Sequence, residues 1–270
     1  MLILIRNCFY FFYNIDAIHE SLCELGIPHG MIYDYPYDDD NNVYLTCTTH
    51  ELGKPVPKHY ISYNFEQLTT EKKWDERFFE RLRKAILVFD YSLENIKILE
   101  QKGIKAYFLP VGYAKCGEYN YPGVEKIYDF AFPGLLNDKR QEKINSLEKI
   151  SNHKVFCTYK HYGRDLEILH KQMKIGINIH YYEKNTILEV HRIIPMIINK
   201  VWVVSERGYD PWYDNIFKNM VDFVDDDNFA QGCLDAYKNY NEEELEKRYQ
   251  YLVNNCKYID YIKNILHLLF

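Results

Sequence analysis

The sequence lacks the short motifs of the commonest phosphate-binding and hydrolytic enzymes. It has no GxxxxGK(S/T) loop, which argues against a P-loop NTPase. No GxGxxG follows the first predicted strand of either half, which argues against a dinucleotide-dependent dehydrogenase. No GxSxG elbow indicates an α/β-hydrolase. The aspartate runs at 38–40 and 225–227 are typical of solvated turns, so we expect no DxD metal site.

Cysteine forms no recognisable framework either. The seven cysteines include no CxxC pair, and we find no His/Cys cluster at zinc spacing. An odd number without a framework favours a reducing compartment. The apolar start lacks a basic region and an AxA cleavage site, and it is too short to span a bilayer. We therefore expect a cytoplasmic protein without a transmembrane segment.

A basic balance is also absent. The formal net charge is −6, from 33 basic and 39 acidic residues, which argues against a nucleic-acid partner. Hydrophobic residues make up 47% of the 270 residues, enough for two domains with cores of their own.

What the chain does have is an alternation of short apolar runs with helical patterns. This alternation predicts an α/β fold with mostly parallel sheets. The predicted strands are Leu2–Ile5, Met31–Tyr33, Val43–Cys47, Tyr60–Tyr63, Ile86–Phe89, Lys105–Leu109, Tyr128–Phe132, Lys154–Thr158, Ile175–His180, Val201–Ser205 and Val221–Val224. The predicted helices are Ala17–Leu25, Trp74–Lys84, Leu93–Gln101, Arg140–Ile150, Leu166–Met173, Ile187–Ile198 and Phe229–Tyr240.

A glycine- and proline-containing stretch at 114–124 divides the two series of elements and predicts a linker. We expect two doubly wound, Rossmann-like domains at residues 1–118 and 125–240. The amphipathic tail at 241–270 predicts a C-terminal helix that leaves the second domain.

Ligands of open parallel sheets bind at the carboxyl ends of the strands, which directs attention to the residues that follow each strand. In FPGLLNDKR, Gly134 permits close backbone approach, and Lys139 and Arg140 lie at a predicted helix start. Backbone N–H groups and two basic side chains there predict an anion site for a diphosphate. The alternative is a tight turn with two solvated basic residues.

A tyrosine-rich loop follows the next predicted strand. Tyr159 or Tyr162 could stack on a base, although the chain has 26 tyrosines and an ordinary exposed loop is the alternative.

The stretch at 174–208 offers the densest group of candidates. Glu189 and Arg192 lie three residues apart on one predicted helix, and Ser205 and Glu206 end the following strand. A carboxylate suits the paired hydroxyls of a ribose, and an arginine suits a phosphate. Glu189 is also favoured by the helix dipole without any ligand. His180 is either a donor ligand or a histidine satisfied at a strand end.

The first half has fewer candidates. His50 and Glu66 each follow a predicted strand, and either could act as a general base. Strand-end position is the only warrant for both, and Glu66 is preferred to His50 by a small margin. Residues beside the same strands, namely His29, Glu51, Asn64 and Gln67, stay open as alternatives.

Taken together, the residues resemble the GT-B glycosyltransferases, in particular the "group 1" type that uses nucleotide sugars. The stretches that carry the resemblance are YISYNFEQL, VFDYSLENIKIL, FLPVGY, FAFPGLLNDKR, KIGINIHYY and LEVHRIIPMIINKVWVVSE. The specific part covers roughly residues 128–206.

The resemblance implies hexosyl transfer from a nucleotide-diphosphate sugar, held by the second domain, to a glycan or other hydroxyl acceptor at the first. It implies no cofactor and no catalytic metal, because helix starts and basic residues stabilise the leaving diphosphate. It places Gly134, Lys139 and Arg140 at the diphosphate and Glu189 at the ribose.

The sequence departs from the pattern of the family at one position. Many retaining members carry two glutamates separated by seven residues, and Tyr181 stands where the first would be. A catalytically silent GT-B-like module that binds a nucleotide, a glycan or a protein is therefore the main alternative. A sugar-phosphate enzyme on a similar fold is a third.

Overall fold

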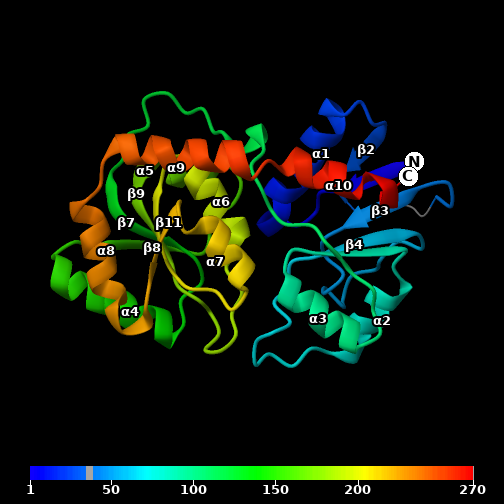
Figure 1. Ribbon diagram of the computed structural model, residues 1–270, viewed down its shortest axis with the longest axis horizontal. Coiled ribbons are helices and arrows are strands. Elements are labelled where there is room, and N and C mark those ends of the chain that lie inside the picture. The colour runs from blue at the N-terminus through cyan, green and yellow to red at the C-terminus, as the bar shows by residue number, and fades with distance from the viewer. Residues whose placement is uncertain (35–38, 270) are drawn as a thin grey trace. The chain divides into compact units, whose positions relative to one another are not determined.

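The computed structural model describes residues 1–34 and 39–269 and divides the chain into two compact units. Unit 1 comprises Met1–Cys116 and the residues from Lys257 onward, and unit 2 comprises Gly117–Cys256 (Figure 1). The aspartate run at 38–40 lies partly outside the described residues, because Asp38 is not among them.

Unit 1 is built on a six-stranded sheet in the order β2-β1-β3-β4-β5-β6, in which neighbouring strands pair in parallel. The strands are β1 (Leu2–Ile5), β2 (His29–Ile32), β3 (Val43–Thr46), β4 (Tyr60–Asn64), β5 (Leu87–Asp90) and β6 (Tyr107–Phe108). The inner strands β1 and β4 are buried on both faces, as expected for a parallel sheet covered by helices.

The helices of unit 1 begin where side chains can cap them. Asp75 accepts from the N–H of Arg77 at the start of α2 (Glu76–Lys84), and Ser92 accepts from two N–H groups at the start of α3 (Leu93–Gln101). The remaining elements are η1 (Phe9–Phe11), α1 (Phe12–Glu24) and α10 (Tyr258–Leu269), and α10 packs against α1. A further short turn, η2 (Lys115–Gly117), lies at the junction of the two units.

Unit 2 has a five-stranded sheet in the order β11-β10-β9-β7-β8, again parallel. Its strands are β7 (Tyr128–Pro133), β8 (Val155–Thr158), β9 (Met173–Asn178), β10 (Trp202–Glu206) and β11 (Val221–Val224). Its helices are α4 (Asp138–Ser151), α5 (Arg164–Gln172), α6 (Val190–Ile198), α7 (Pro211–Phe217), η3 (Asp226–Asn228), α8 (Phe229–Lys238) and α9 (Glu242–Asn255). Helix α4 packs on α8, and α6 packs on α9 (Figure 1). The predicted α/β class with two Rossmann-like domains is confirmed.

The tail differs from the expected single helix at 241–270. It forms two helices, α9 and α10, and the break falls at Cys256 and Lys257. The N–H of Tyr258 donates to the carbonyl of Tyr113, 2.8 Å away, instead of continuing the helical ladder. The first helix therefore belongs to unit 2 and the second to unit 1.

Both sheets follow the doubly wound order 2-1-3-4-5, in which the chain reverses direction across the sheet between the first and third strands. This reversal places the topological switch point between β1 and β3 in unit 1, and between β7 and β9 in unit 2. The loops that leave these strands at their carboxyl ends are therefore the places where a ligand site is expected.

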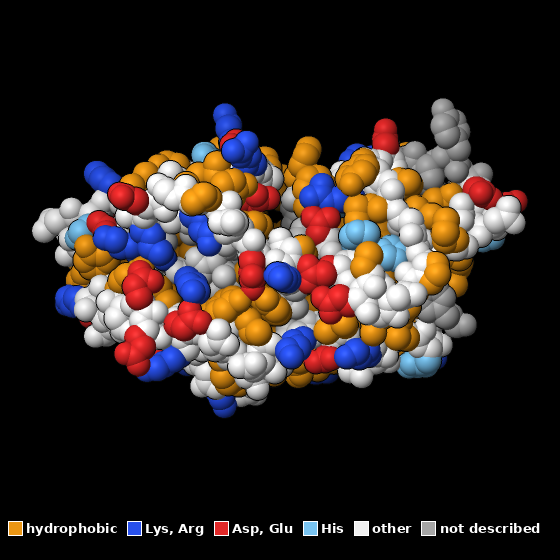
Figure 2. Space-filling view, turned by 90° about the horizontal axis from the view of Figure 1, so that it is seen from above, with side chains coloured by type: hydrophobic (Ala, Val, Ile, Leu, Met, Phe, Trp, Pro, Cys, Tyr) orange, Lys and Arg blue, Asp and Glu red, His pale blue; other side chains and the backbone are white. Residues whose placement is uncertain are grey.

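The surface carries charges of both signs. Figure 2 shows Lys and Arg side chains interspersed with Asp and Glu over the face that it presents. Within the part of the chain that the structure describes, no helix has the length and apolar character needed to cross a membrane.

Candidate functional site

The carboxyl ends of β7, β9 and β10 in unit 2 hold a dense cluster of charged and polar side chains. Glu189 is at its centre, 4% exposed and immediately before α6. The sequence placed Glu189 in the first turn of a helix from Ile187, but α6 begins at Val190, so Glu189 is the N-cap residue and its side chain makes no capping bond. Its carboxylate is therefore free to turn toward the strand ends.

Asn178, the last residue of β9, connects the members of this cluster. Its side-chain N–H₂ donates to Glu189 Oε2 at 3.0 Å and to Ser205 Oγ at 2.9 Å. Its carbonyl oxygen accepts from Arg192 at 2.8 Å. Glu189 and Arg192 are thus linked through a third residue.

His180 lies two residues beyond β9, not within the strand as predicted, and it is buried. Its Nδ1 lies 2.9 Å from Glu189 Oε2, and its Nε2 lies 2.8 Å from the carbonyl oxygen of Arg207. Both neighbours only accept hydrogen bonds, so the ring donates from both nitrogens as an imidazolium. Burial opposes this charge, but Glu189 raises the pKa of His180 above its usual value.

Arg140, at the start of α4, is 2% exposed and points inward. It donates to the carbonyls of Ile179 and Leu135 at 2.9 and 2.7 Å, and its guanidinium lies 3.7 Å from Glu189 Oε1. Burial, followed by repulsion from Arg192, lowers the pKa of Arg140 to about 10, so the group stays charged at neutral pH.

The ionisation of Glu189 follows from these neighbours. Burial by itself raises the pKa of a carboxyl group. His180, Arg192 and Arg140 outweigh burial and hold the pKa of Glu189 well below its usual range. The carboxylate is therefore a buried anion with cations beside it.

Glu206, at the end of β10, gathers a second set of partners. Its carboxylate accepts a hydrogen bond from the backbone N–H of His180 and forms an ion pair with Lys143. Lys139 Nζ lies 3.5 Å from the same carboxylate. Lys143 also pairs with Asp226. The 225–227 run is therefore exposed as expected, but Asp226 is not simply solvated.

The cluster carries more positive than negative charge. Its cations are Lys139, Arg140, Lys143, Arg192 and His180, whose two ring nitrogens both face acceptors. Its anions are Glu189, Glu206 and Asp226. Five positive charges and three negative charges give the cluster a net charge of +2. The bridging diphosphate of a nucleotide sugar carries the opposite charge, −2.

In unit 1 the structure brings the two alternative bases together. His50 follows β3 and Glu66 follows β4, and His50 Nε2 lies 3.4 Å from Glu66 Oε1, longer than a normal hydrogen bond. The side chains are 20% and 24% exposed. Burial lowers the pKa of His50 although Glu66 and Glu51 act in the opposite direction, so the ring is neutral at pH 7.

The other polar groups at the strand ends of unit 1 are engaged internally. Asp90, at the end of β5, accepts from Asn64 at 2.7 Å and from Asn95 at 3.0 and 3.2 Å. Asn95 in turn accepts from the N–H of Leu68. This network fixes the loops after β4 and β5.

Sequence relatives and solved structures give this geometry a context. No protein-family profile matches the chain. Uncharacterized protein L140 of Acanthamoeba polyphaga mimivirus is 28% identical over 97% of this chain and 89% of its own length. Uncharacterized protein R358 of the same virus is 29% identical over 60% of this chain and 56% of its own length.

Among solved structures, AviGT4, a glycosyltransferase of avilamycin A biosynthesis, superposes with a TM-score of 0.65 at 10% identity, covering 99% of this chain and 96% of its own. HepE of Anabaena, solved with UDP and glucose, gives 0.63 at 8% identity, with 99% and 98% coverage. Sucrose-phosphate synthase of Thermosynechococcus elongatus gives 0.58 at 12% identity, with 100% and 98% coverage.

The chain has a GT-B-like fold.

Within this GT-B-like fold, the donor residues predicted from sequence fall into two groups. Six of them meet in the cluster: Lys139, Arg140, His180, Glu189, Ser205 and Glu206, with Arg192 joined through Asn178. Gly134 and Tyr159 lie outside its hydrogen bonds. Tyr159 is 51% exposed after the edge strand β8, and Lys160 lies over its ring.

Gly134 has a steric reason to be glycine. A Cβ added there would come within 2.7 Å of the ring of Phe132, which is itself fully buried. The guanidinium groups of Arg140 and Arg192 lie 5.1 and 5.6 Å from the centre of the same ring. Gly134 therefore lets the strand end close over an aromatic ring that both arginines contact.

Sequence reasoning missed Asn178, Lys143 and Phe132. Asn178 had a signal, because an amide that ends an otherwise apolar run needs a buried partner. Lys143 had none, since it is one of several charged residues within a predicted helix.

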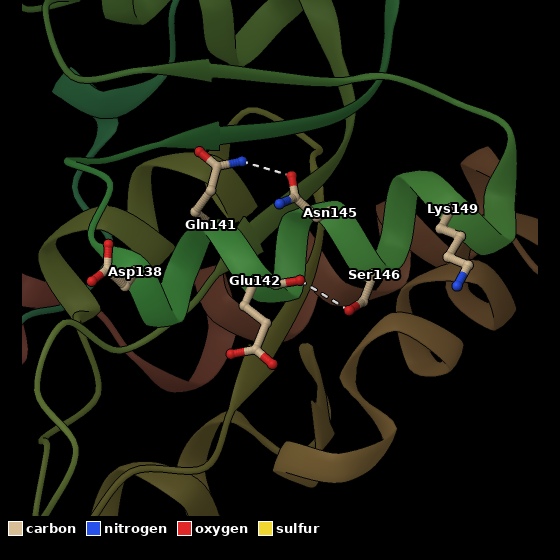
Figure 3. A pocket seen from close by; sticks show the side chains of 6 residues that line it. All are labelled: Asp138, Gln141, Glu142, Asn145, Ser146 and Lys149. Carbon is tan, nitrogen blue, oxygen red and sulfur yellow. Dashed lines mark hydrogen bonds between the residues drawn. The ribbon is translucent and has the colours of Figure 1, made fainter.

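A shallow depression on the outer face of α4 is not part of this site. Its lining residues are Asp138, Gln141, Glu142, Asn145, Ser146 and Lys149 (Figure 3). All are exposed and belong to one helix, and Gln141 bonds Asn145 along it. Because no second element contributes, the depression offers no converging set of groups.

The structure adds one group of possible metal ligands that the spacing along the sequence does not indicate. The sequence showed no His/Cys cluster at zinc spacing, yet in unit 1 the structure brings His19, Cys23 and His29 together, with their ligand atoms within 4.8 Å of one another. The spacing of these residues along the chain is unlike that of zinc fingers. His29 reaches the other two because the chain turns back from α1 into β2.

Proposed function

We propose that the protein is a glycosyltransferase that moves a sugar from a nucleotide-diphosphate sugar to an acceptor hydroxyl without a catalytic metal. The observation that carries this proposal is the excess of two positive charges at the switch point of unit 2. A bound diphosphate would balance this excess in a site of low dielectric. The GT-B-like fold and the UDP bound by HepE support the same proposal.

The proposed donor contacts follow from the positions of the cations. Lys139, 16% exposed at its side chain, and Arg192 would contact the diphosphate. Arg140 would not contact it but would hold the Glu189 carboxylate in place through their ion pair. Glu189 would accept from the ribose hydroxyls, and Tyr159 would stack on the base. In the transfer, the acceptor oxygen bonds to the anomeric carbon, and the bond to the diphosphate oxygen breaks with its electron pair.

The acceptor proton needs a base, for which we propose the His50–Glu66 pair. The neutral His50 ring can take the proton, and the Glu66 carboxylate beside it would stabilise the resulting imidazolium. This assignment joins the two candidates that the sequence left as alternatives.

A thermal-shift series with UDP, GDP, dTDP and ADP tests donor binding directly. A nucleotide at 100 times its Kd adds about 2.7 kcal/mol of stability. We expect the nucleotide with one particular nucleobase to raise the melting temperature of the protein. Lys139→Gln should reduce this thermal shift, and Lys149→Gln on the outer face of α4 should leave it unchanged. No shift with any nucleotide would contradict the proposal.

One observation favours a second candidate, a GT-B-like module that binds without catalysis. Both oxygens of Glu189 already face partners within the protein, Asn178 and His180 on one and Arg140 on the other. A carboxylate so engaged has less to offer a ribose. Hydrolysis of the matching nucleotide sugar separates the two candidates, because a silent module binds the donor and leaves it intact.

A further inference from the structure

His19, Cys23 and His29 form a compact group on unit 1, away from the strand ends discussed above. His19 and Cys23 are four residues apart on α1 and so lie on one face of the helix. His29 is the first residue of β2. Cys23 is exposed and both histidines are half-buried, so solvent reaches the group.

Hydrogen bonds fix the tautomer of His29. Its Nδ1 lies 2.8 Å from the carbonyl oxygen of Ile27, which can only accept, so Nδ1 carries the proton. Its Nε2 is therefore unprotonated and directs its lone pair at His19 Nδ1, 2.8 Å away. Histidines that bind metals are oriented in this way, with one nitrogen donating to a carbonyl and the other directed at the ion.

The separations are close to those of a tetrahedral zinc site. With Zn–N of about 2.0–2.1 Å and Zn–S of about 2.3 Å, two nitrogens on one ion lie about 3.3 Å apart, and a nitrogen and a sulfur about 3.6 Å apart. Here the nitrogens are 2.8 Å apart, and Cys23 Sγ lies 3.8 and 4.0 Å from the two nitrogens of His19. All three ligand atoms lie within 4.8 Å of one another, so rotations of these side chains would bring the set to the required separations.

The geometry points to a binding site for one divalent transition-metal ion of the zinc class, held by His19, Cys23 and His29 with a water in the fourth position. Two imidazoles and a thiolate favour zinc over the oxygen-seeking magnesium and calcium ions. When the ion binds, the Cys23 thiol loses its proton to solvent, and the His19 proton moves from Nδ1 to Nε2. One proton is therefore released for each ion bound.

The proposed ion would have a structural role and would take no part in the transfer reaction. His29 begins β2, so the site lies at the amino edge of the sheet, whereas His50 and Glu66 follow the carboxyl ends of their strands. An ion there would tie the second half of α1 to β2 and close the turn at residues 25–28. The inference is independent of the proposed transfer, which uses no metal.

Titration of the EDTA-treated full chain with Zn²⁺ and with Co²⁺ tests the site. We expect one equivalent of Zn²⁺ to bind, Mg²⁺ not to compete, and Co²⁺ to give a thiolate-to-metal charge-transfer band. Cys23→Ser should abolish the band, and His29→Ala should weaken Zn²⁺ binding by about 10–100-fold or more.

Cys116→Ser is the matched control, because Cys116 is an exposed cysteine of the same unit outside the cluster. It should keep both the band and the affinity. Unchanged Zn²⁺ binding in Cys23→Ser, or no stoichiometric binding by the unaltered chain, would overturn the proposal. Nucleotide-induced thermal shifts measured with EDTA report on unit 2 separately, so failure of one proposal is distinguishable from failure of the other.

Discussion

The two sheets share one strand order but differ in the chemistry at their carboxyl ends. At the switch point of unit 2, eight charged groups, most of them buried, form a cluster of ion pairs and hydrogen bonds around the ends of three strands. In unit 1, the corresponding edge presents a partly exposed His50–Glu66 pair beside an internally satisfied amide network. Fold position alone therefore locates a site, while burial and charge decide what the site can do.

This difference implies different costs of mutation. Removing one partner of a buried ion cluster leaves other charges without compensation in a medium that solvates them poorly. Removing one member of a partly exposed pair leaves the other in contact with water. The variants below test that contrast, beginning with the largest expected effect.

Glu189→Gln should cause the largest loss. It removes the carboxylate that contacts the His180 ring and the Arg140 guanidinium, so we expect the free energy of unfolding to fall by about 3–5 kcal/mol and the nucleotide-induced thermal shift to disappear. Urea unfolding and thermal shift measure the two effects. Glu142→Gln, on the exposed face of α4, is the control and should change neither. A stable Glu189→Gln protein would remove the contrast between the units.

His50→Gln should affect rate without affecting stability. Loss of a general base typically lowers the rate by about 10²–10⁴-fold. We expect a decrease in transfer rate within that range, while the free energy of unfolding changes by less than about 1 kcal/mol because the pair is partly exposed. His59→Gln, a histidine of the same unit that precedes β4, is the control. Equal rates in the two variants would exclude the pair as the base.

Tyr159→Ala should weaken donor binding moderately. Loss of a stacked base contact costs about 1–3 kcal/mol, and the exposed ring contributes little to folding. Calorimetric titration with the preferred nucleotide measures the change. Tyr209, 48% exposed in the same unit, provides the matched Tyr209→Ala control. If both variants bind equally well, the base does not stack on Tyr159.

The smallest effect concerns pH. The folded-state pKa of His180 is raised above its unfolded value, so its contribution to stability is complete below about pH 6.5 and is lost as the pH rises through the folded pKa. Each unit of difference corresponds to about 1.4 kcal/mol. His180→Asn should therefore flatten the decline in unfolding free energy above pH 6.5. Urea unfolding across this pH range measures the slope, with the unaltered chain as the control.

Sequence predicted the elements better than it predicted the site. Buried strands of parallel sheets appear in the sequence as apolar runs, and longer helices appear as periodic patterns. The bounds of β11 and α3 are those that these patterns predicted. Helix α7 was missed although Asp210 and Pro211 mark its start, because seven residues are too few to show a period.

The site was only partly predictable because its contacts depend on strand order. Residues at strand ends could be named as candidates, but nothing in the sequence says that β7 lies beside β9. The contact between Arg140 and Glu189 spans 49 positions and exists only because those two strands are neighbours. The tail helix broke for a similar reason, since its interruption depends on a distant carbonyl at Tyr113.

The return of α10 to unit 1 also has a consequence for how the chain is made. Ile262 and Ile265 are buried in unit 1, and the Tyr258 hydroxyl bonds that of Tyr63. On the ribosome, these residues emerge only after all of unit 2 has been synthesised. Unit 2 is continuous and can fold as soon as it emerges, while unit 1, although begun first, is completed last. The order of completion is therefore the reverse of the order of synthesis.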